Sequence, residues 1–305
     1  MTETGTVLVV TTIPKDLRDA LSAEYRLQDH QKAPDGTWAQ QPGIGVALTT
    51  SMAGADAALM DALPDLKLIA CQGVGLDKID LAAAEARGIR VANTPDVLTE
   101  DTADFGIALI YATARSIVRA DQFVRAGRWP NERITPSRRV SGKTVGIVGL
   151  GRIGQTVARK AEGLGLTVLY SGPRAKPDVG YRFVADVVDL AAQADFLVLT
   201  CPGGPATDKM IDARVLEALG PDGILINIAR GSVVDEAALI DALERKAIAG
   251  AGLDVFANEP KFDETFLKFE NVVLQPHYAS ITFETRKAII GLLQKAIAET
   301  FAQAT

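Results

Sequence analysis

Short, almost wholly apolar runs alternate with longer amphipathic stretches, and this alternation constrains the fold more than any other feature. A first series of runs occupies 6–11, 45–50, 66–71 and 89–94. A second series follows KTVGIVGLGRIG and occupies 167–171, 196–201, 223–228, 249–256 and 271–276. Strands that are apolar on both sides need cover on both faces, as in parallel sheets flanked by helices. The pattern therefore predicts an α/β protein with two series of βα units.

The 305-residue length agrees with two domains. The stretch 99–126 is predicted to be one long helix, opened by acidic residues and closed by glycine, and the polar, basic segment 129–141 is predicted to be a loop or arm. The terminal stretch ITFETRKAIIGLLQKAIAETF is strongly amphipathic. We expect a substrate domain made of 1–98 and 285–305, a dinucleotide-binding domain made of 99–284, and a cleft between them.

Composition narrows the possible partners. The chain has 48% hydrophobic and 23% charged residues with a net charge of −6, which disfavours a nucleic-acid or anionic-membrane surface. Cys71 and Cys201 have no CxxC spacing, so neither a disulfide framework nor a zinc site is expected. The N-terminus lacks a basic region before its short apolar run, and no apolar stretch is long enough to cross a bilayer. We expect a cytoplasmic, soluble protein without a metal.

A glycine motif marks the start of the second series. Gly149, Gly151 and Gly154 form GLGRIG, directly after the strand-like VGIV and at the start of a helical pattern. In such a motif the first glycine permits a tight turn, the second lets a pyrophosphate approach the backbone, and the third lets helix and strand pack closely. A glycine-rich connection without a ligand is the alternative. The flanking strand and helix favour dinucleotide binding.

The end of the next strand bears on the choice of dinucleotide. An NAD site places an acidic residue there for the ribose 2′-hydroxyl, but the sequence reads LYSGPR and reaches no acid before Asp178. Ser171 can hydrogen-bond a 2′-phosphate, and Arg174 can pair with it. The sequence therefore predicts NADP(H), with NAD(H) as the less favoured alternative. A solvated basic loop is the structural alternative for Arg174.

Three later runs end in residues with recognisable chemistry. Arg230 follows INIA, Glu259 lies in AGLDVFANEP, and His277 follows LQP. A doubly wound sheet binds its ligand at the carboxyl ends of its strands, so these side chains are expected to gather there. The other histidine, His30, lies in the polar stretch RLQDHQKAPDG and is predicted to be a surface residue.

These residue types suit the reduction of a 2-keto acid. The reaction needs a hydride at the carbonyl carbon, a proton for the developing alkoxide and a cation for the carboxylate. His277 is the candidate acid, since imidazole titrates near neutral pH. Glu259 would orient its ring and favour the imidazolium, and Arg230 would hold the carboxylate.

The same segments, with PDLKLIACQGVGLDKIDLAAAEARGIRVANTPDVLTEDTAD, resemble the D-isomer-specific 2-hydroxyacid dehydrogenase family over almost the whole chain. Within that family the chain is most similar to the NADPH-preferring glyoxylate/hydroxypyruvate reductase branch. The resemblance implies a flavodoxin-like substrate domain, an NAD(P)-binding Rossmann domain and the roles given above for Arg230, Glu259 and His277. It also implies a homodimer, with the long helix and the arm 129–141 as the contact.

The resemblance implies further binding residues, for which a turn or capping role is the alternative. Val74 and Gly75 would receive the substrate carboxylate on their backbone amides. Asp254 matches an aspartate that binds the nicotinamide carboxamide in family members. The predicted cofactor-binding set is Thr102, Gly149, Gly151, Arg152, Ile153, Gly154, Ser171, Arg174, Thr207, Ile228, Asp254 and His277. The predicted substrate-binding set is Val74, Gly75 and Arg230.

The expected activity is NADPH-dependent reduction of glyoxylate to glycolate and of hydroxypyruvate to D-glycerate. Enzymatic alternatives are an NAD-dependent D-lactate-type dehydrogenase, a 2-ketogluconate reductase and an aromatic 2-keto acid reductase. An alternative from another class is a dinucleotide-sensing binding protein like the co-repressors that resemble this family. Tyr278 and the stretch 49–54 bear on substrate choice in a direction that the sequence does not give.

Overall fold

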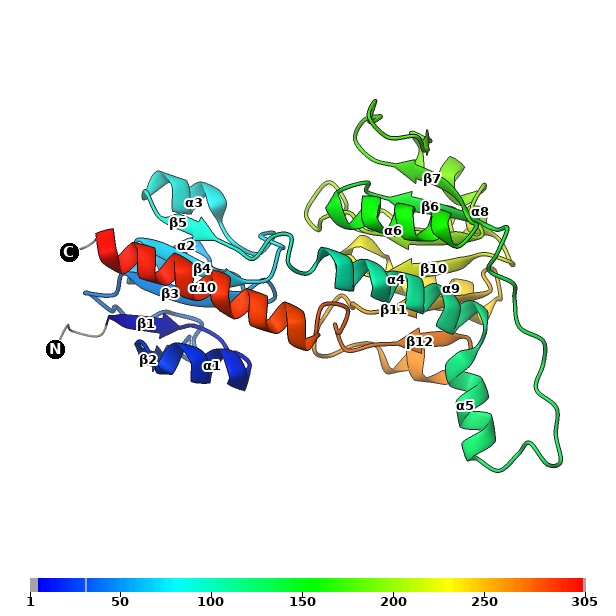
Figure 1. Cartoon of the computed structure of the whole chain (residues 1–305), viewed down its shortest axis with the longest axis horizontal. Helices are drawn as coiled ribbons and strands as arrows, with labels where there is room; N and C mark the ends of the chain where they lie inside the picture. Colours follow the sequence, from blue (N-terminus) through cyan, green and yellow to red (C-terminus); the bar gives the residue numbers. More distant parts are fainter. Residues whose placement is uncertain (1–4, 31, 304–305) are drawn as a thin grey trace. The chain divides into compact units, whose positions relative to one another are not determined.

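The computed structural model describes residues 5–30 and 32–303, which form two compact units (Figure 1). Unit 1 comprises Met1–Leu98 and Ile281–Thr305, and unit 2 comprises Thr99–Ser280. The chain therefore passes into unit 2 once and returns once. The return lies after Ser280, slightly earlier than the expected boundary at 284.

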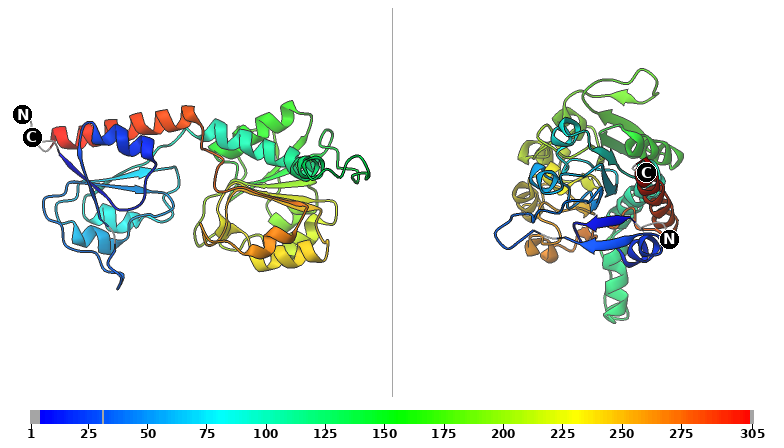
Figure 2. Two further views of the ribbon diagram at one scale, coloured as in Figure 1. Left: turned by 90° about the horizontal axis from the view of Figure 1, so that it is seen from below. Right: turned by 90° about the vertical axis from the view of Figure 1, so that its left-hand side faces the viewer.

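Unit 1 is a five-stranded parallel sheet in the order β2-β1-β3-β4-β5, the arrangement of flavodoxin-like folds. Side chains alternate between its faces: Val7 and Val9 of β1 pack with α1 and α10, whereas Leu8 packs with α2. Figure 2 shows helices on both faces of this sheet. The strands are β1 (Thr6–Val9), β2 (Arg26–Asp29), β3 (Val46–Thr50), β4 (Leu68–Gln72) and β5 (Arg90–Ala92). The helices are α1 (Lys15–Ser22), α2 (Ala57–Ala62), α3 (Leu81–Ala86) and α10 (Phe283–Gln303).

Unit 2 is a seven-stranded parallel sheet in the order β12-β11-β10-β9-β6-β7-β8. The strands are β6 (Thr144–Val148), β7 (Thr167–Ser171), β8 (Arg182–Phe183), β9 (Phe196–Leu199), β10 (Ile224–Asn227), β11 (Gly250–Leu253) and β12 (Val272–Leu274). The helices are α4 (Thr99–Ala114), α5 (Ile117–Arg125), α6 (Arg152–Gly163), α7 (Val187–Ala191), α8 (Ala213–Leu219) and α9 (Glu236–Glu244), with 3-10 turns η1 (Gly231–Val233) and η2 (Glu264–Lys268).

Two apolar cores lie on opposite faces of the unit 2 sheet. One joins α4 and α6 to the strands, and the other joins α7, α8 and α9 to them (Figure 2). The strand order reverses at β6, which lies between β7 and β9. A doubly wound sheet binds its ligand at this switch point, beyond the carboxyl ends of the strands. The glycine motif follows β6 directly.

The prediction of one helix over 99–126 is wrong. α4 ends at Ala114 and α5 begins at Ile117, with Ser116 between them in the left-handed region at φ 50°. The amide of Arg138, in the arm, donates to the Ala114 carbonyl at 2.9 Å and so replaces the helical hydrogen bond lost at the break. Apolar residues recur on both sides of this two-residue break, so the pattern of the sequence did not reveal it.

The surface prediction for His30 is also wrong. Its side chain is only 7% exposed, its amide donates to the Val9 carbonyl at 2.8 Å, and its ring centroid lies 5.4 Å from that of Trp38. The cause is β2, a short edge strand that the polar sequence around Arg26–Asp29 did not predict. Because β2 pairs with β1, the residue that follows β2, His30, lies at the edge of the apolar core.

Among the described residues, no helix is both long and apolar enough to cross a membrane.

Candidate active site

The three glycines of GLGRIG meet different surroundings. A Cβ on Gly149, at φ +94°, would lie 2.7 Å from the backbone of Cys201, and a Cβ on Gly154 would lie 2.2 Å from the Gly149 carbonyl oxygen. A Cβ on Gly151 would meet nothing within 4 Å. Packing therefore requires glycine at the first and third positions. At Gly151 the fold leaves open space, which is what a pyrophosphate approaching the backbone needs.

The N-terminus of α6 is suited to an anion. Gly151 is its N-cap, and a glycine has no side chain that could accept a hydrogen bond from the first-turn amides. Arg152 and Ile153 follow in that turn, with Arg152 exposed and Ile153 half-buried. Open space beside a helix N-terminus without a side-chain cap fits a dinucleotide phosphate.

Ser171 and Arg174 lie at the end of β7, next to the glycine loop. Ser171 is buried, its carbonyl accepts from the Gly149 amide at 2.9 Å, and its hydroxyl donates to the Ala185 carbonyl at 3.2 Å. The single hydroxyl proton of Ser171 is thus used within the fold. Arg174 is exposed, so its guanidinium is the more accessible of the two groups for a 2′-phosphate.

Three adjacent strands carry the predicted reacting groups. β10 pairs with β11 at Asn227 and Leu253, and β11 pairs with β12 at Leu253 and Leu274. Arg230, Glu259 and His277 follow these three strand ends. The parallel register thus brings together residues that are far apart in sequence.

Glu259 and His277 form a closely bonded pair. Oε2 of Glu259 lies 2.7 Å from Nδ1 of His277, and Oε1 accepts from the Phe256 amide at 2.8 Å. Burial opposes ionisation of Glu259, but its hydrogen bond to His277, the His277 charge, the Phe256 amide and the Arg230 charge outweigh burial and lower the pKa of its carboxyl. An ionised Glu259 fixes the ring through Nδ1, so Nε2 is the ring nitrogen that lies outside this pair.

The backbone around His277 is held by Asp254. The Asp254 carboxylate accepts from the amides of Tyr278 at 2.6 Å and Ala279 at 3.1 Å, while its carbonyl accepts from the His277 amide at 2.8 Å. These bonds hold His277 at φ 54°, a left-handed conformation that is unusual for histidine. Burial raises the pKa of Asp254, against the effect of the two amides.

Arg230 lies at the N-terminus of η1. Its Nη1 donates to the Ala229 carbonyl at 2.7 Å, and its own carbonyl accepts from the side chain of Asn227 at 3.0 Å. Asn227 also accepts from the Ala229 amide at 3.0 Å. Sequence reasoning missed Asn227, although a polar residue ending the apolar strand ILIN is a usable signal.

Three other predicted cofactor residues have structural contacts. Thr102 is buried in the first turn of α4, and Ile228 is buried with its side chain against Gly106 of the same helix. Thr207 donates its hydroxyl to the Pro202 carbonyl at 2.7 Å and closes the turn after β9. All three lie in unit 2.

Val74 and Gly75 lie in unit 1, in the turn after β4. The side chain of Asn93 donates to the Val74 carbonyl at 2.9 Å, and the Gly73 amide donates to the Thr94 hydroxyl at 3.1 Å. Both contacts hold the turn from the end of β5. Sequence reasoning did not single out Asn93 or Thr94.

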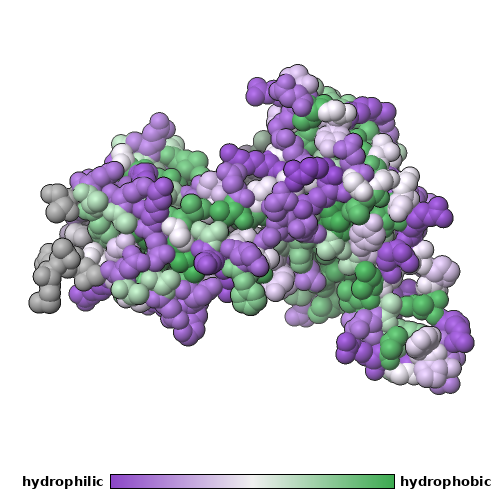
Figure 3. All heavy atoms as spheres, viewed as in Figure 1, coloured by the Kyte–Doolittle hydropathy of each residue, from purple (hydrophilic) through white to green (hydrophobic). Residues whose placement is uncertain are grey.

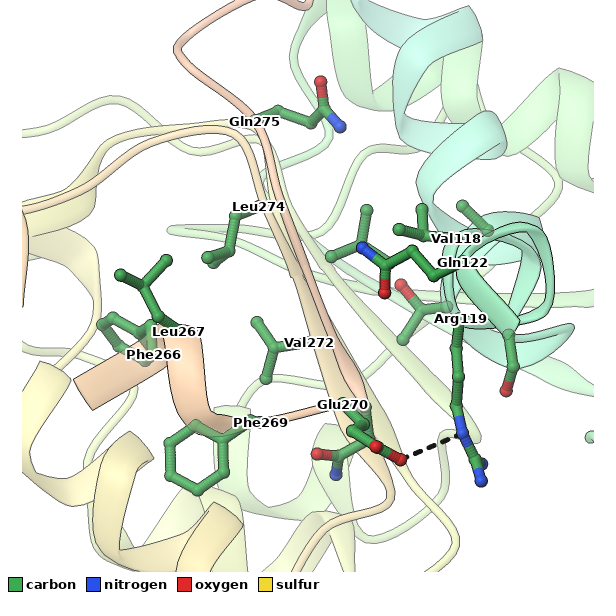
Figure 4. A pocket seen from close by; sticks show the side chains of 15 residues that line it. Val118, Arg119, Gln122, Phe266, Leu267, Phe269, Glu270, Val272, Leu274 and Gln275 are labelled. Carbon is green, nitrogen blue, oxygen red and sulfur yellow. Dashed lines mark ion pairs between the residues drawn. The ribbon is translucent and has the colours of Figure 1, made fainter. Parts of the chain in front are cut away.

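A pocket of about 320 Å³ lies elsewhere in unit 2, between the α4–α5 junction and β12 (Figure 4). Val118, Arg119, Leu267 and Gln275 are among its lining residues, and an Arg119–Glu270 ion pair of 3.1 Å lies at one side. None of the predicted site residues lines it. Within 5–30 and 32–303, no cluster of three or more His, Cys, Asp or Glu side chains is arranged to hold a metal ion.

A doubly wound sheet, a glycine loop at its switch point and an acid–base pair at adjacent strand ends define a nicotinamide-dinucleotide-dependent oxidoreductase. Comparison with known proteins agrees. Residues 107–279 match the model of the D-isomer specific 2-hydroxyacid dehydrogenase NAD binding domain. The chain belongs to the D-isomer specific 2-hydroxyacid dehydrogenase family.

Relatives and solved structures cover almost the whole chain. Hydroxyphenylpyruvate reductase of Plectranthus scutellarioides is 44% identical over 94% of this chain and 93% of its own length. 2-Ketogluconate reductase of Gluconobacter oxydans is 48% identical over 83% of this chain and 81% of its own. The NADPH-dependent glyoxylate/hydroxypyruvate reductase of Sinorhizobium meliloti, solved with NADP and malonate, superposes with a TM-score of 0.89 at 39% identity over 97% and 93% of the two chains.

Proposed function

We propose that the protein reduces small 2-keto acids with NADPH, converting glyoxylate to glycolate and hydroxypyruvate to D-glycerate. The observation that carries this proposal is the 2.7 Å pair of Glu259 and His277, which follows strands adjacent to the one that precedes Arg230. An imidazole oriented by a carboxylate and accompanied by a guanidinium matches the proton and the cation that the reaction needs.

Each residue has a separate task in this proposal. His277 donates the proton from Nε2 to the carbonyl oxygen, and Glu259 stays ionised at Nδ1 to keep the ring oriented and to favour the imidazolium. Arg230 holds the substrate carboxylate and polarises the carbonyl, and the amides of Val74 and Gly75 bind the same carboxylate. Bound NADPH supplies the hydride to the carbonyl carbon. Unit 1 is thus the substrate domain and unit 2 the cofactor domain.

A steady-state screen tests the activity. Glyoxylate, hydroxypyruvate, pyruvate, phenylpyruvate and 2-ketogluconate are each offered with NADPH and with NADH, and the oxidation of the cofactor is followed. The highest kcat/KM is expected for glyoxylate or hydroxypyruvate with NADPH. Cofactor binding without turnover of any of the five acids would favour a dinucleotide sensor instead.

The preference for NADPH rests on Arg174 in this proposal. Arg174 is exposed at the end of β7, and the β7 end carries no carboxylate before Asp178. Loss of a guanidinium–phosphate contact is expected to lower kcat/KM for NADPH by about 10- to 100-fold, since a charge-assisted hydrogen bond contributes about 1.5–3 kcal/mol. Comparing both cofactors before and after Arg174→Ala measures this. Unchanged discrimination would remove Arg174 from the proposal.

We also propose a homodimer in the cytoplasm. Five large apolar or aromatic side chains are exposed on α5 and the arm that follows: Ile117, Val118, Val124, Trp129 and Ile134. Figure 3 shows green atoms among purple ones at this end of unit 2. Exposed apolar side chains near one another are common where proteins contact each other. Both cysteines are buried and neither is in a disulfide, which suits a reducing compartment.

A further inference from the structure

Glu236, the first residue of α9, makes a contact that its own helix does not need. The N-cap of α9 is Asp235, whose side chain accepts from the Ala238 amide. The Glu236 carboxylate instead accepts from the amide of Ala257 at 2.8 Å, far away in sequence. Ala257 lies in the loop between β11 and Glu259.

The contact joins the two loops that carry the reacting groups. Gly231, next to Arg230, packs so tightly against the second loop that a Cβ would lie 1.9 Å from the Phe256 carbonyl carbon and 2.2 Å from the Ala257 nitrogen. Two consecutive amides of that loop are then held by carboxylates, Phe256 by Glu259 and Ala257 by Glu236. The segment after β10 therefore fixes the turn that presents Glu259 to His277.

The position of Glu236 is electrostatically unfavourable. Burial raises the pKa of its carboxyl against the Ala257 hydrogen bond, and the nearby Asp263 and Glu259 charges raise it further. A carboxylate that served only to start a helix would be better placed in solvent, away from two others. What the fold gains in return is a fixed loop.

We propose that Glu236 is a positioning residue of the active site: by holding the Ala257 amide it sets the loop that carries Glu259 and thereby the orientation of His277. The inference rests on the proposed reductase function. It assigns no contact between Glu236 and substrate or cofactor. For this role the Glu236 side chain must be long enough to place an acceptor oxygen at the Ala257 amide. Its negative charge is of secondary importance.

Three substitutions of Glu236 separate the effect of side-chain length from the effect of charge. Glu236→Gln keeps the length and one acceptor oxygen, Glu236→Asp keeps the charge and shortens the reach, and Glu236→Ala removes both. The matched control is Asp212→Ala, which removes a carboxylate that accepts from Arg214 and Val215 amides at the start of α8. It is also in unit 2 and on a helix start, but its side chain bonds to Arg214 and Val215 rather than to either loop.

The kinetic result should be specific to kcat. Glu236→Ala and Glu236→Asp are expected to lower kcat with the best 2-keto acid by about 10- to 100-fold, the range found when groups that orient a site residue are lost. KM and the NADPH Kd should change by less than about threefold, because neither ligand contacts Glu236. Glu236→Gln should stay within about threefold of the wild type in kcat. Equal losses in the Gln and Asp variants, or full kcat in Glu236→Ala, would overturn the proposal.

Deuterium uptake of the peptide 254–260 tests the same loop without any turnover. Uptake should accelerate in Glu236→Ala and Glu236→Asp, and should match the wild type in Glu236→Gln and Asp212→Ala. A wild type that turns over no 2-keto acid would refute the proposed function, while this measurement would still decide the role of Glu236. An unchanged uptake rate in Glu236→Ala would refute the positioning role alone.

Discussion

At the scale of single residues, His277 is the group whose loss should affect the reaction most. His277→Gln removes the proposed proton donor and is expected to lower kcat by about 100-fold or more, in the range of general acid catalysis. NADPH binding should persist, because the glycine loop is untouched. Cofactor titration and steady-state kinetics on the same sample measure both effects.

The other histidine provides a matched control. His30 is buried against Trp38, so His30→Gln should lower Tm while the folded enzyme keeps its kcat. If the two variants lose kcat equally, His277 is not the acid. This comparison works only because the chain has two histidines.

Glu259 should make stability depend on pH in a defined direction. The pKa of its carboxyl is lowered in the folded state, so ionised Glu259 stabilises the fold above its ordinary pKa, and this contribution is lost as pH falls through the lowered value. Glu259→Gln lacks the contribution. The Tm gap between wild type and variant should therefore narrow from about pH 7 to about pH 3, either side of the ordinary glutamate pKa near 4.3. A gap that stays constant would contradict the assignment.

The candidate reacting residues could be named from sequence, and their roles stay predictions, whereas most of the residues that hold their loops could not be named. Arg230, Glu259 and His277 each follow an apolar run and carry distinctive chemistry. Asn93 and Glu236 bond to backbone groups of other loops, and such partners are defined only by the fold. Asn227 bonds within its own loop, where the polar end of ILIN was a signal. The hydroxyl of Ser171 illustrates the same limit, since its donation to the Ala185 carbonyl has no signal in the sequence.

At the scale of elements, two glycines of the glycine loop have different tasks: Gly154 is needed for packing, and Gly151 is proposed to be needed for cofactor binding. Gly154→Ala places a Cβ 2.2 Å from the Gly149 carbonyl and is expected to destabilise the fold by about 1–3 kcal/mol, the usual cost of overpacking.

In Gly151→Ala the added Cβ has no neighbouring atom within 4 Å, and the backbone φ at this position is an ordinary −73°. The Tm of this variant should therefore match that of the wild type. Its NADPH Kd should rise by about tenfold, since the methyl group occupies the space left for the pyrophosphate. Thermal unfolding and cofactor titration distinguish the two; a normal Kd in Gly151→Ala would show that the open space is not the binding site.

The elements themselves were predictable where apolar patterning was strong. The sequence predicted the strand at 167–171 with the bounds that β7 has, and predicted the buried strands of both sheets within a few residues. It missed β2 and β8, which are short and lie at sheet edges. It also missed the break between α4 and α5, because apolar residues recur in the sequence on both sides of Arg115 and Ser116.

At the scale of the whole molecule, the proposed dimer makes its own prediction. Ile117→Asp with Val124→Asp introduces two charges on the exposed face of α5 and should raise the dimer dissociation constant by about 100-fold or more, if these residues are central contacts. Leu164→Asp, an exposed leucine after α6, is the control and should leave the association unchanged. Sedimentation velocity over a concentration series gives the result. A wild type that sediments as a monomer at all concentrations would rule out the dimer.

The two crossings between the units, after Leu98 and after Ser280, have a consequence for how such a protein can diversify. The proposed acid–base pair, the residues Asp254 and Glu236 that hold its loops, and the glycine loop are encoded within one uninterrupted stretch, and the sequence on either side of it belongs to the other unit. Exchange of this internal stretch at both junctions can therefore transfer the proposed reducing site to a different substrate domain. Laboratory chimaeras with close relatives have natural exchange points at these two positions, where a junction interrupts no strand or helix.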